Sequence, residues 1–113
     1  MKTLNEQLWD VVLNVYAEMS CNTTHASQEI GMSVRTMRDC LRLYRQGRKR
    51  RINPRIGSFL WLREKDIIIE ALCLCNGNRC ATGRLLGVND RLIRLKIAAY
   101  KKHGFWEGFY DTK

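Results

Sequence analysis

Histidine, proline and acidic side chains are scarce in this chain of 113 residues, which holds two His, one Pro and 11 Asp or Glu against 20 Lys or Arg. It contains no G-x4-G-K-[ST] loop for binding nucleotide phosphates. Neither His25 nor His103 has a plausible nucleophile or carboxylate beside it in the sequence. Asp10 and Asp66 are expected to be surface helix residues rather than a catalytic pair. We therefore expect no enzyme activity, no cofactor and no metal site.

Long apolar runs are missing as well. The only extended run, residues 67–75, is interrupted by Glu70 and is far too short to span a bilayer. The first ten residues contain one Lys and two acids, so they lack the basic and apolar regions of a signal peptide. These absences argue against a membrane or secreted protein and favour the cytoplasm. The apolar content of 45% is still enough for a small core.

The five cysteines are odd in number, and without a signal peptide they are expected to be reduced thiols. The cluster Cys73-x-Cys75-x4-Cys80 is a weak candidate for a metal site, because zinc sites usually use two ligand pairs. The helical pattern also places Cys73 on a buried stripe. We interpret the cysteines as structural thiols that pack like small apolar side chains, with metal binding as the less favoured alternative.

The chain contains an internal repeat with a period of 56 residues. Asp10-Val11-Val12-Leu13 aligns with Asp66-Ile67-Ile68-Ile69, and Ile30-Gly31-Met32-Ser33 aligns with Leu86-Gly87-Val88-Asn89. No gap is needed across residues 4–48. Matches that keep both residue character and spacing indicate a tandem duplication, whose period sets the architecture.

Each half is predicted to fold into three helices, at about residues 3–19, 23–30 and 34–46 in the first half and 59–75, 79–86 and 90–103 in the second. Asn22 and Asn78 are suitable N-caps for the short helices. The glycines that follow these helices, at positions 31 and 87, supply the left-handed residue that ends a helix. Ser33 and Asn89 then cap the third helices.

A short helix, a glycine turn and a capped second helix make up a helix-turn-helix. Ser27 and Gly83 stand four residues before the two turn glycines, where steeply crossing helices require a small residue. The predicted fold class is therefore all-α, with two tandem three-helix helix-turn-helix repeats joined by a basic linker. The predicted boundaries are 1–47 for the first repeat, 48–58 for the linker, 59–104 for the second repeat and 105–113 for an aromatic tail.

The second half resembles a known family. The run Asn76-Gly77-Asn78-Arg79-Cys80-Ala81-Thr82-Gly83-Arg84-Leu85-Leu86-Gly87-Val88-Asn89, followed by Ile93-Arg94 and Ala99-Tyr100-Lys101-Lys102-His103-Gly104, is similar to the Fis-type helix-turn-helix. That module is the DNA-binding end of Fis and of NtrC-type activators, and the resemblance covers nearly 45 residues. The first half is a more diverged copy.

The resemblance implies a cytoplasmic, nucleoid-associated DNA-binding protein of a bacterium, phage or plasmid, whose third helix enters the major groove. By the family motif, Asn89 and the next residue would touch bases, while Arg94 and Lys96 would hold phosphates. The next residue here is Asp90, where the family commonly has a basic side chain. An acid at that place can accept a hydrogen bond from cytosine N4.

The cations support the same prediction without the resemblance. In the third helix of the first half, Arg35, Arg38, Arg42 and Arg45 recur at three- and four-residue steps and form one stripe. Arg91 and Arg94, joined by Lys101, form the matching stripe in the second half. The alternative interpretation is a solvated helix face. Cations that bind phosphates displace counterions, so we expect DNA binding with a steep salt dependence.

The linker carries five cations, no acid and the chain's only proline, Pro54, and so contributes +5 to a net charge of +9. Such a segment is attracted to a narrow minor groove or to phosphates. A solvated, flexible linker is the alternative. The complete predicted DNA-binding set is Asn22, Ser33, Arg35, Thr36, Arg38, Arg42, Arg45, Arg48, Lys49, Arg50, Arg51, Arg55, Asn78, Arg79, Asn89, Asp90, Arg91, Arg94, Lys96 and Lys101.

The predicted function is a sequence-specific, double-stranded DNA-binding transcriptional regulator. One alternative is an architectural or recombination-accessory protein that bends DNA, and another is a protein-interaction module. The tail Phe105-Trp106-Glu107-Gly108-Phe109-Tyr110 holds four aromatic residues and is expected to pack back onto the helices. Its alternative roles are self-association, giving a homodimer, or contact with a protein partner.

Overall fold

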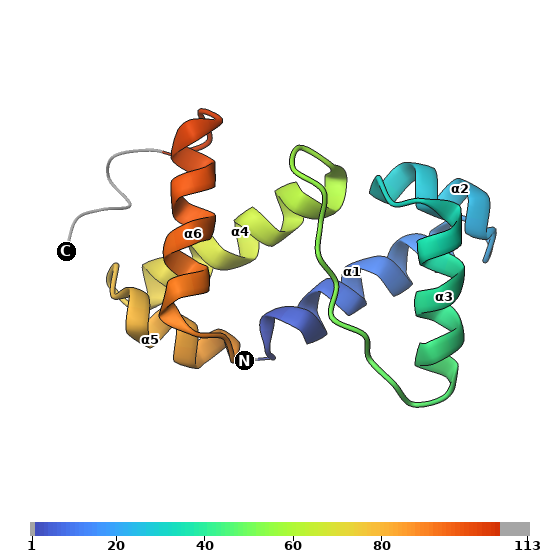
Figure 1. Cartoon of the computed structure of the whole chain (residues 1–113), viewed down its shortest axis with the longest axis horizontal. Coiled ribbons are helices and arrows are strands. Elements are labelled where there is room, and N and C mark those ends of the chain that lie inside the picture. Colours follow the sequence, from blue (N-terminus) through green and yellow to red (C-terminus); the bar gives the residue numbers. More distant parts are fainter. Residues whose placement is uncertain (1, 107–113) are drawn as a thin grey trace. The chain divides into compact units, whose positions relative to one another are not determined.

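The computed structural model describes residues 2–106, and within this range it consists of six α-helices and no strand (Figure 1). The prediction of an all-α protein is therefore confirmed. No helix in the described range is long and apolar enough to cross a membrane. The helices are α1 (Leu4–Glu18), α2 (Thr23–Ile30), α3 (Val34–Arg45), α4 (Phe59–Leu74), α5 (Arg79–Leu86) and α6 (Asp90–Lys102).

Side-chain caps set the ends of α2 and α3, as the sequence predicts. The Asn22 side chain accepts a hydrogen bond from the backbone N–H of His25 at 3.0 Å, which satisfies one of the free N–H groups of α2. Gly31 ends α2 in the left-handed region with φ +88°. Ser33 then caps α3 by accepting from the backbone N–H of Thr36.

The same devices set the ends of α5 and α6. Asn78 caps α5 by accepting from the backbone N–H of Ala81 at 3.0 Å. Gly87 ends α5 in the left-handed region with φ +71°, and Asn89 caps α6. The predicted bounds of the two short helices are confirmed residue for residue, because each end is marked by a capping side chain or a glycine.

Small residues lie where each short helix meets the helix that follows it. A Cβ added to Gly83 would lie 2.7 Å from the carbonyl oxygen of Val88, so no side chain fits there without a shift of the backbone. Ser27, at the same place in α2, is only 1% exposed, and its hydroxyl donates to the carbonyl of Thr24. The expected requirement for a small residue is met at both positions.

The chain divides into two compact units, and the boundary between them falls inside α4, after Glu64. The first unit spans residues 5–64 and includes α2, α3 and the segment that leads to α4. Its buried apolar side chains include Trp9 and Val12 from α1 and Met37 and Leu41 from α3. The ring of Trp9 stacks on that of Tyr44, with 4.9 Å between their centroids, so α1 and α3 pack directly.

The second unit joins the rest of α4, α5 and α6 to the first residues of the chain. Its buried side chains include Leu4, Ile68, Leu86 and Ile97. The turn between α5 and α6 packs against the start of α1, because a Cβ added to Gly87 would lie 2.9 Å from Thr3 Cγ2.

The cysteines depart from the sequence prediction. Only Cys40 is buried, while Cys21, Cys73 and Cys80 are exposed. The prediction that Cys73 belongs to a buried stripe is wrong, because the buried side of α4 runs through residues 61, 64, 68, 71 and 72. Position 73 follows Leu72 by about 100° around the helix and so turns to solvent.

Candidate nucleic-acid interface

The basic stripe of α3 lies on the exposed side of that helix. Arg35, Arg38, Arg42 and Arg45 are all exposed, whereas the opposite side of α3 is buried through Met37, Cys40 and Leu41. Arg45 Nη2 donates to the hydroxyl of Tyr16 at 3.4 Å. In the described part of the chain none of the four arginines pairs with a carboxylate. The stripe therefore presents four exposed guanidinium groups, and the one acid of α3, the half-buried Asp39, forms no ion pair with them.

The polar residues at the helix starts already hold local hydrogen bonds. Ser33 Oγ accepts from the backbone N–H of Thr36 at 3.1 Å and donates to Thr36 Oγ1 at 2.7 Å. The side-chain oxygens of Asn22, Asn78 and Asn89 are likewise used as caps. Their amide NH2 groups are the parts of these side chains able to donate to a base or a phosphate.

The start of α6 carries a different electrostatic arrangement. The carboxylate of Asp90 lies 3.4 Å from Arg94 Nε, one helical turn away. The same carboxylate accepts from the Cys80 thiol at 3.7 Å. Arg91 and Arg94 are exposed and Lys96 is half-buried. The charge of Arg94 is therefore partly balanced by Asp90 within α6. The arginines of the α3 stripe form no such ion pair in the described residues.

Residues 48–58, which we call the strap, connect α3 to α4 and run beside α1 (Figure 1). The indole nitrogen of Trp9 donates to the carbonyl of Arg50 at 2.8 Å, and the backbone N–H of Ile52 donates to Asn5 Oδ1 at 2.9 Å. Ile52 itself is buried, with 6% of its surface exposed. These contacts attach the main chain of the strap to α1.

The strap holds its basic side chains outward. Arg48, Lys49, Arg50, Arg51 and Arg55 are exposed, while the main chain between them is fixed by Asn5, Trp9 and Ile52. The strap ends at Ser58, whose hydroxyl accepts from the backbone N–H of Trp61 and so begins α4. A Cβ on Gly31 would lie 2.6 Å from Ser58 Cβ, so the turn between α2 and α3 touches this end directly.

The structure therefore gathers the predicted residues into two groups. The first unit brings together the α3 stripe and the strap, and the second unit brings together the start of α6 with Asn78 and Arg79. Arg79 Nη1 donates to the carbonyl of Gly77 at 2.9 Å, which holds it beside its own helix start. Asn5 and Trp9, which fix the strap, were missed from the sequence because their partners lie more than 40 positions away.

The first two aromatic residues of the tail lie near lysines of the second unit. Lys65 Nζ lies 5.8 Å from the centre of the Phe105 ring, and Lys101 Nζ lies 5.5 Å from that of Trp106. These distances are within the range of cation–π attraction. Phe105 is 41% exposed, so this part of the tail is only partly covered by the helices, and Phe109 and Tyr110 lie outside the described residues.

No cluster of three or more His, Cys, Asp or Glu able to hold a metal ion occurs in the part of the chain that the structure describes. The chain matches no protein-family model, no curated protein and no solved structure. Its function is therefore inferred from its residues and their geometry.

Proposed function

We propose that this protein binds double-stranded DNA through two tandem helix-turn-helix repeats and regulates transcription at specific sites. In this proposal α3 and α6 are the third helices of the repeats and enter the major groove. The matching caps support it, since Asn22, Gly31 and Ser33 recur as Asn78, Gly87 and Asn89 at the same spacing. The resemblance of the second half to the Fis-type helix-turn-helix supports the same assignment.

The observation that carries the proposal is the exposed, unpaired cationic surface of the first unit. Four arginines on one side of α3 and five cations on the strap face solvent without a carboxylate partner in the described residues. DNA presents closely spaced phosphates with condensed counterions, and each phosphate neutralised by Lys or Arg releases counterions. A surface of this charge therefore gains affinity for a duplex without any base contact.

Base reading is assigned to the helix starts. In the major groove an Asn amide can bind adenine, an Arg can bind guanine and a carboxylate can accept from cytosine N4. Asn89 and Asp90 stand at the start of α6, and Ser33 stands at the start of α3. We assign the α6 start to base reading, and the α3 stripe and the strap to phosphate contacts.

Two third helices in one chain predict a long binding site. Paired helix-turn-helix motifs read half-sites about one turn of DNA apart, about 34 Å centre to centre. A single chain would then cover two successive major grooves. A chemical footprint that protects only one groove per chain would show that only one of the two repeats reads DNA.

A second candidate function, DNA bending by an architectural protein, is favoured by the strap. Its main chain is fixed while its arginines are exposed, so it can follow a narrowed minor groove at little further cost in entropy. The two candidates differ in one measurement. A bending protein changes the gel mobility of duplexes according to the phase of the site, whereas an unbent complex does not.

The direct test is fluorescence anisotropy with a labelled 30-base-pair duplex of random sequence. Arg38→Ala removes a central, unpaired cation of α3 and is expected to weaken binding about tenfold, in the range of one lost charged contact. Arg63→Ala, a cation of α4 outside the predicted set, is the matched control and should change the affinity less than twofold. Equal effects of the two substitutions would contradict the placement of α3 at the DNA.

A further inference from the structure

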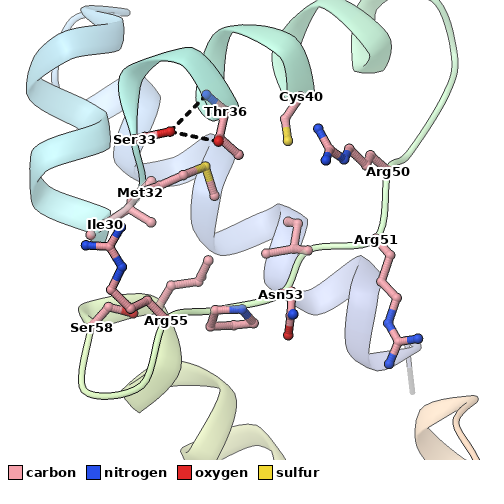
Figure 2. Close-up of a pocket in the computed structure, with 14 residues that line it drawn as sticks. Ile30, Met32, Ser33, Thr36, Cys40, Arg50, Arg51, Asn53, Arg55 and Ser58 are labelled. Atoms are coloured by element: carbon pink, nitrogen blue, oxygen red, sulfur yellow. Dashed lines mark hydrogen bonds between the residues drawn. The ribbon is translucent and has the colours of Figure 1, made fainter.

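A cavity of about 260 Å³ lies in the first unit, between the turn that joins α2 to α3 and the strap (Figure 2). Its apolar lining residues Ile30, Ile52 and Leu60 are only 1%, 6% and 1% exposed, so the protein itself already covers them. Arg50 and Arg55 stand on opposite sides of the opening (Figure 2). A ligand in the cavity would therefore cover little further apolar surface.

A different situation holds on α6, where a large apolar side chain is open to a partner. The large apolar residues that are exposed in the described part of the chain are Ile56, Phe59, Leu74, Leu95 and Phe105. Leu95, which is 58% exposed, is the one that lies on α6, and none of them lies on α3. It follows the fully buried Ile93 by two positions, which turns it about 200° away from the core side of the helix.

Along this outer side of α6, two apolar residues stand between two cations. Arg91, Leu95, Ala98 and Lys102 are all exposed, and they follow one another at steps of four, three and four residues, so they share one side of the helix. The long side chains of Arg91 and Lys102 can reach out to phosphates. The shorter side chains of Leu95 and Ala98 can meet only what lies directly against the helix.

The major groove of DNA offers one apolar group to such a side chain. The base edges there present the N7 and O6 acceptors of guanine, the N4 donor of cytosine, the N7 acceptor and N6 donor of adenine, and the O4 acceptor and C5-methyl group of thymine. A leucine side chain gains free energy when it covers the methyl group, because both surfaces leave water. Against a polar edge it would instead displace water from a hydrogen-bonding group.

We propose that Leu95 reads a thymine in the DNA site by packing its side chain on the C5-methyl group of that base. This inference rests on the proposed function, because it requires that α6 enters the major groove. It adds a base identity to that function and makes Leu95 a residue that determines specificity. In α3 the residue 56 positions earlier is Asp39, so the inference applies to α6 alone.

The first test is a selection of bound duplexes from a random 30-base-pair library, read by sequencing. The unchanged protein should select a site with at least one preferred thymine. Leu95→Ala should lose the preference for that thymine and keep the preferences at the other positions. This variant is expected to fold, since Leu95 is exposed and alanine favours a helix.

Leu74→Ala is the matched control for the selection. Leu74 is 64% exposed and belongs to the same unit, but it lies at the end of α4. Its loss removes as much exposed apolar surface without touching α6. The bases selected by this variant should therefore be those selected by the unchanged protein.

The second test removes the methyl group from the DNA. Uracil pairs with adenine as thymine does but lacks the C5-methyl group, so the preferred thymine of the selected duplex is replaced by uracil. In anisotropy titrations the unchanged protein should bind the uracil duplex about fourfold more weakly, as expected for one methyl group lost from an apolar contact. Leu95→Ala should bind the two duplexes with equal affinity.

The outcomes separate this inference from the proposed function. Equal affinity of the unchanged protein for the thymine and uracil duplexes, or a thymine preference that persists in Leu95→Ala, would contradict the role of Leu95 and leave DNA binding intact. Selection without any preferred base would contradict base reading as a whole, and the absence of bound duplex would contradict the proposed function itself. If Leu95 instead contacts a second copy of the chain, Leu95→Ala would lower the mass measured by sedimentation and leave the ratio of the two affinities unchanged, which would also overturn the inference.

Discussion

The α2–α3 pair of the first unit and the α5–α6 pair of the second unit share their backbone design but differ in charge. Both pairs begin with an Asn cap and turn at a left-handed glycine. In α3 the one acid, Asp39, is half-buried and the first turn holds none, whereas α6 begins with Asp90, whose carboxylate pairs with Arg94. The two pairs therefore share a backbone but differ in surface charge. In our proposal the α3 surface provides affinity through phosphate contacts, and the start of α6 reads bases.

The loops between the long and short helices show the same relation between a common backbone and different residues. Ser20 and Cys21 have positive φ values of 55° and 59°, and Asn76 and Gly77, 56 positions later, have 54° and 82°. Cys21 and Gly77 even form the same hydrogen bond, to the carbonyls of Tyr16 and Leu72 at 2.9 Å. The second loop uses residues that tolerate this conformation, and the first does not.

The largest expected difference between the two pairs concerns the position four residues before the turn glycine. Gly83→Ala should lower the free energy of unfolding by about 2–3 kcal/mol, because the new Cβ would press on the Val88 carbonyl oxygen and this outweighs the gain in helix propensity. Ser27→Ala removes only a hydroxyl that donates to Thr24 and should cost about 1 kcal/mol or less. Urea unfolding measures both, and equal losses would show that the two crossings are alike.

The anchoring of the strap, which follows α3, can be tested separately. Ile52→Ala should destabilise the protein by about 2 kcal/mol, since it removes most of a buried side chain. Ile56→Ala is the matched control within the strap: Ile56 is 58% exposed, and its loss should change the stability by less than about 0.5 kcal/mol. In hydrogen exchange, the Ile52 amide should lose its protection in the first variant only. A protected amide in Ile52→Ala would mean that the strap is held without its apolar anchor.

Single substitutions in the two loops that precede α2 and α5 should change the stability less, and in opposite directions. Cys21→Gly should stabilise the protein, and Gly77→Ala should destabilise it, each by about 1 kcal/mol, because only glycine takes a positive φ without strain. Thermal unfolding under reducing conditions measures both changes. Loss of stability in Cys21→Gly would show that the Cys21 side chain contributes more than its strained backbone costs.

The smallest effect concerns Asp90. Asp90→Asn removes a negative charge from the start of α6 and frees Arg94, so the affinity for random-sequence duplex should rise about threefold at low salt. The N-cap of α6 is Asn89, so the helix start is preserved in this variant. Anisotropy titrations at two salt concentrations measure the change. Unchanged affinity at low salt would place Asp90 away from the phosphates.

Most of the helical framework could be predicted from the sequence because its signals are local. Asn22, Gly31 and Ser33 mark three consecutive helix ends by themselves, and the structure agrees at each. The buried positions follow helical periodicity, as Trp9 and Trp61 in the long helices show. Cys73 was misplaced because it borders the apolar side of α4, where a shift of one residue turns a side chain from the core to solvent.

The strap and the cavity could not be predicted because they depend on distant contacts. Nothing near Arg50 in the sequence shows that its carbonyl accepts from Trp9, 41 positions earlier. Ile52 is an isolated apolar residue among cations, and the only local signal for its burial is that contrast. The cavity depends in turn on the path of the strap, so it follows from neither composition nor periodicity.

The most direct test of the central claim is the salt dependence of binding to a random-sequence duplex by the unchanged protein. If the α3 stripe and the strap contact phosphates, binding should be tight at 50 mM salt, and the logarithm of the affinity should fall with the logarithm of the salt concentration with a slope of about −4 or steeper. A slope between 0 and about −1, or no binding at 50 mM salt, would contradict a DNA-binding function for this surface.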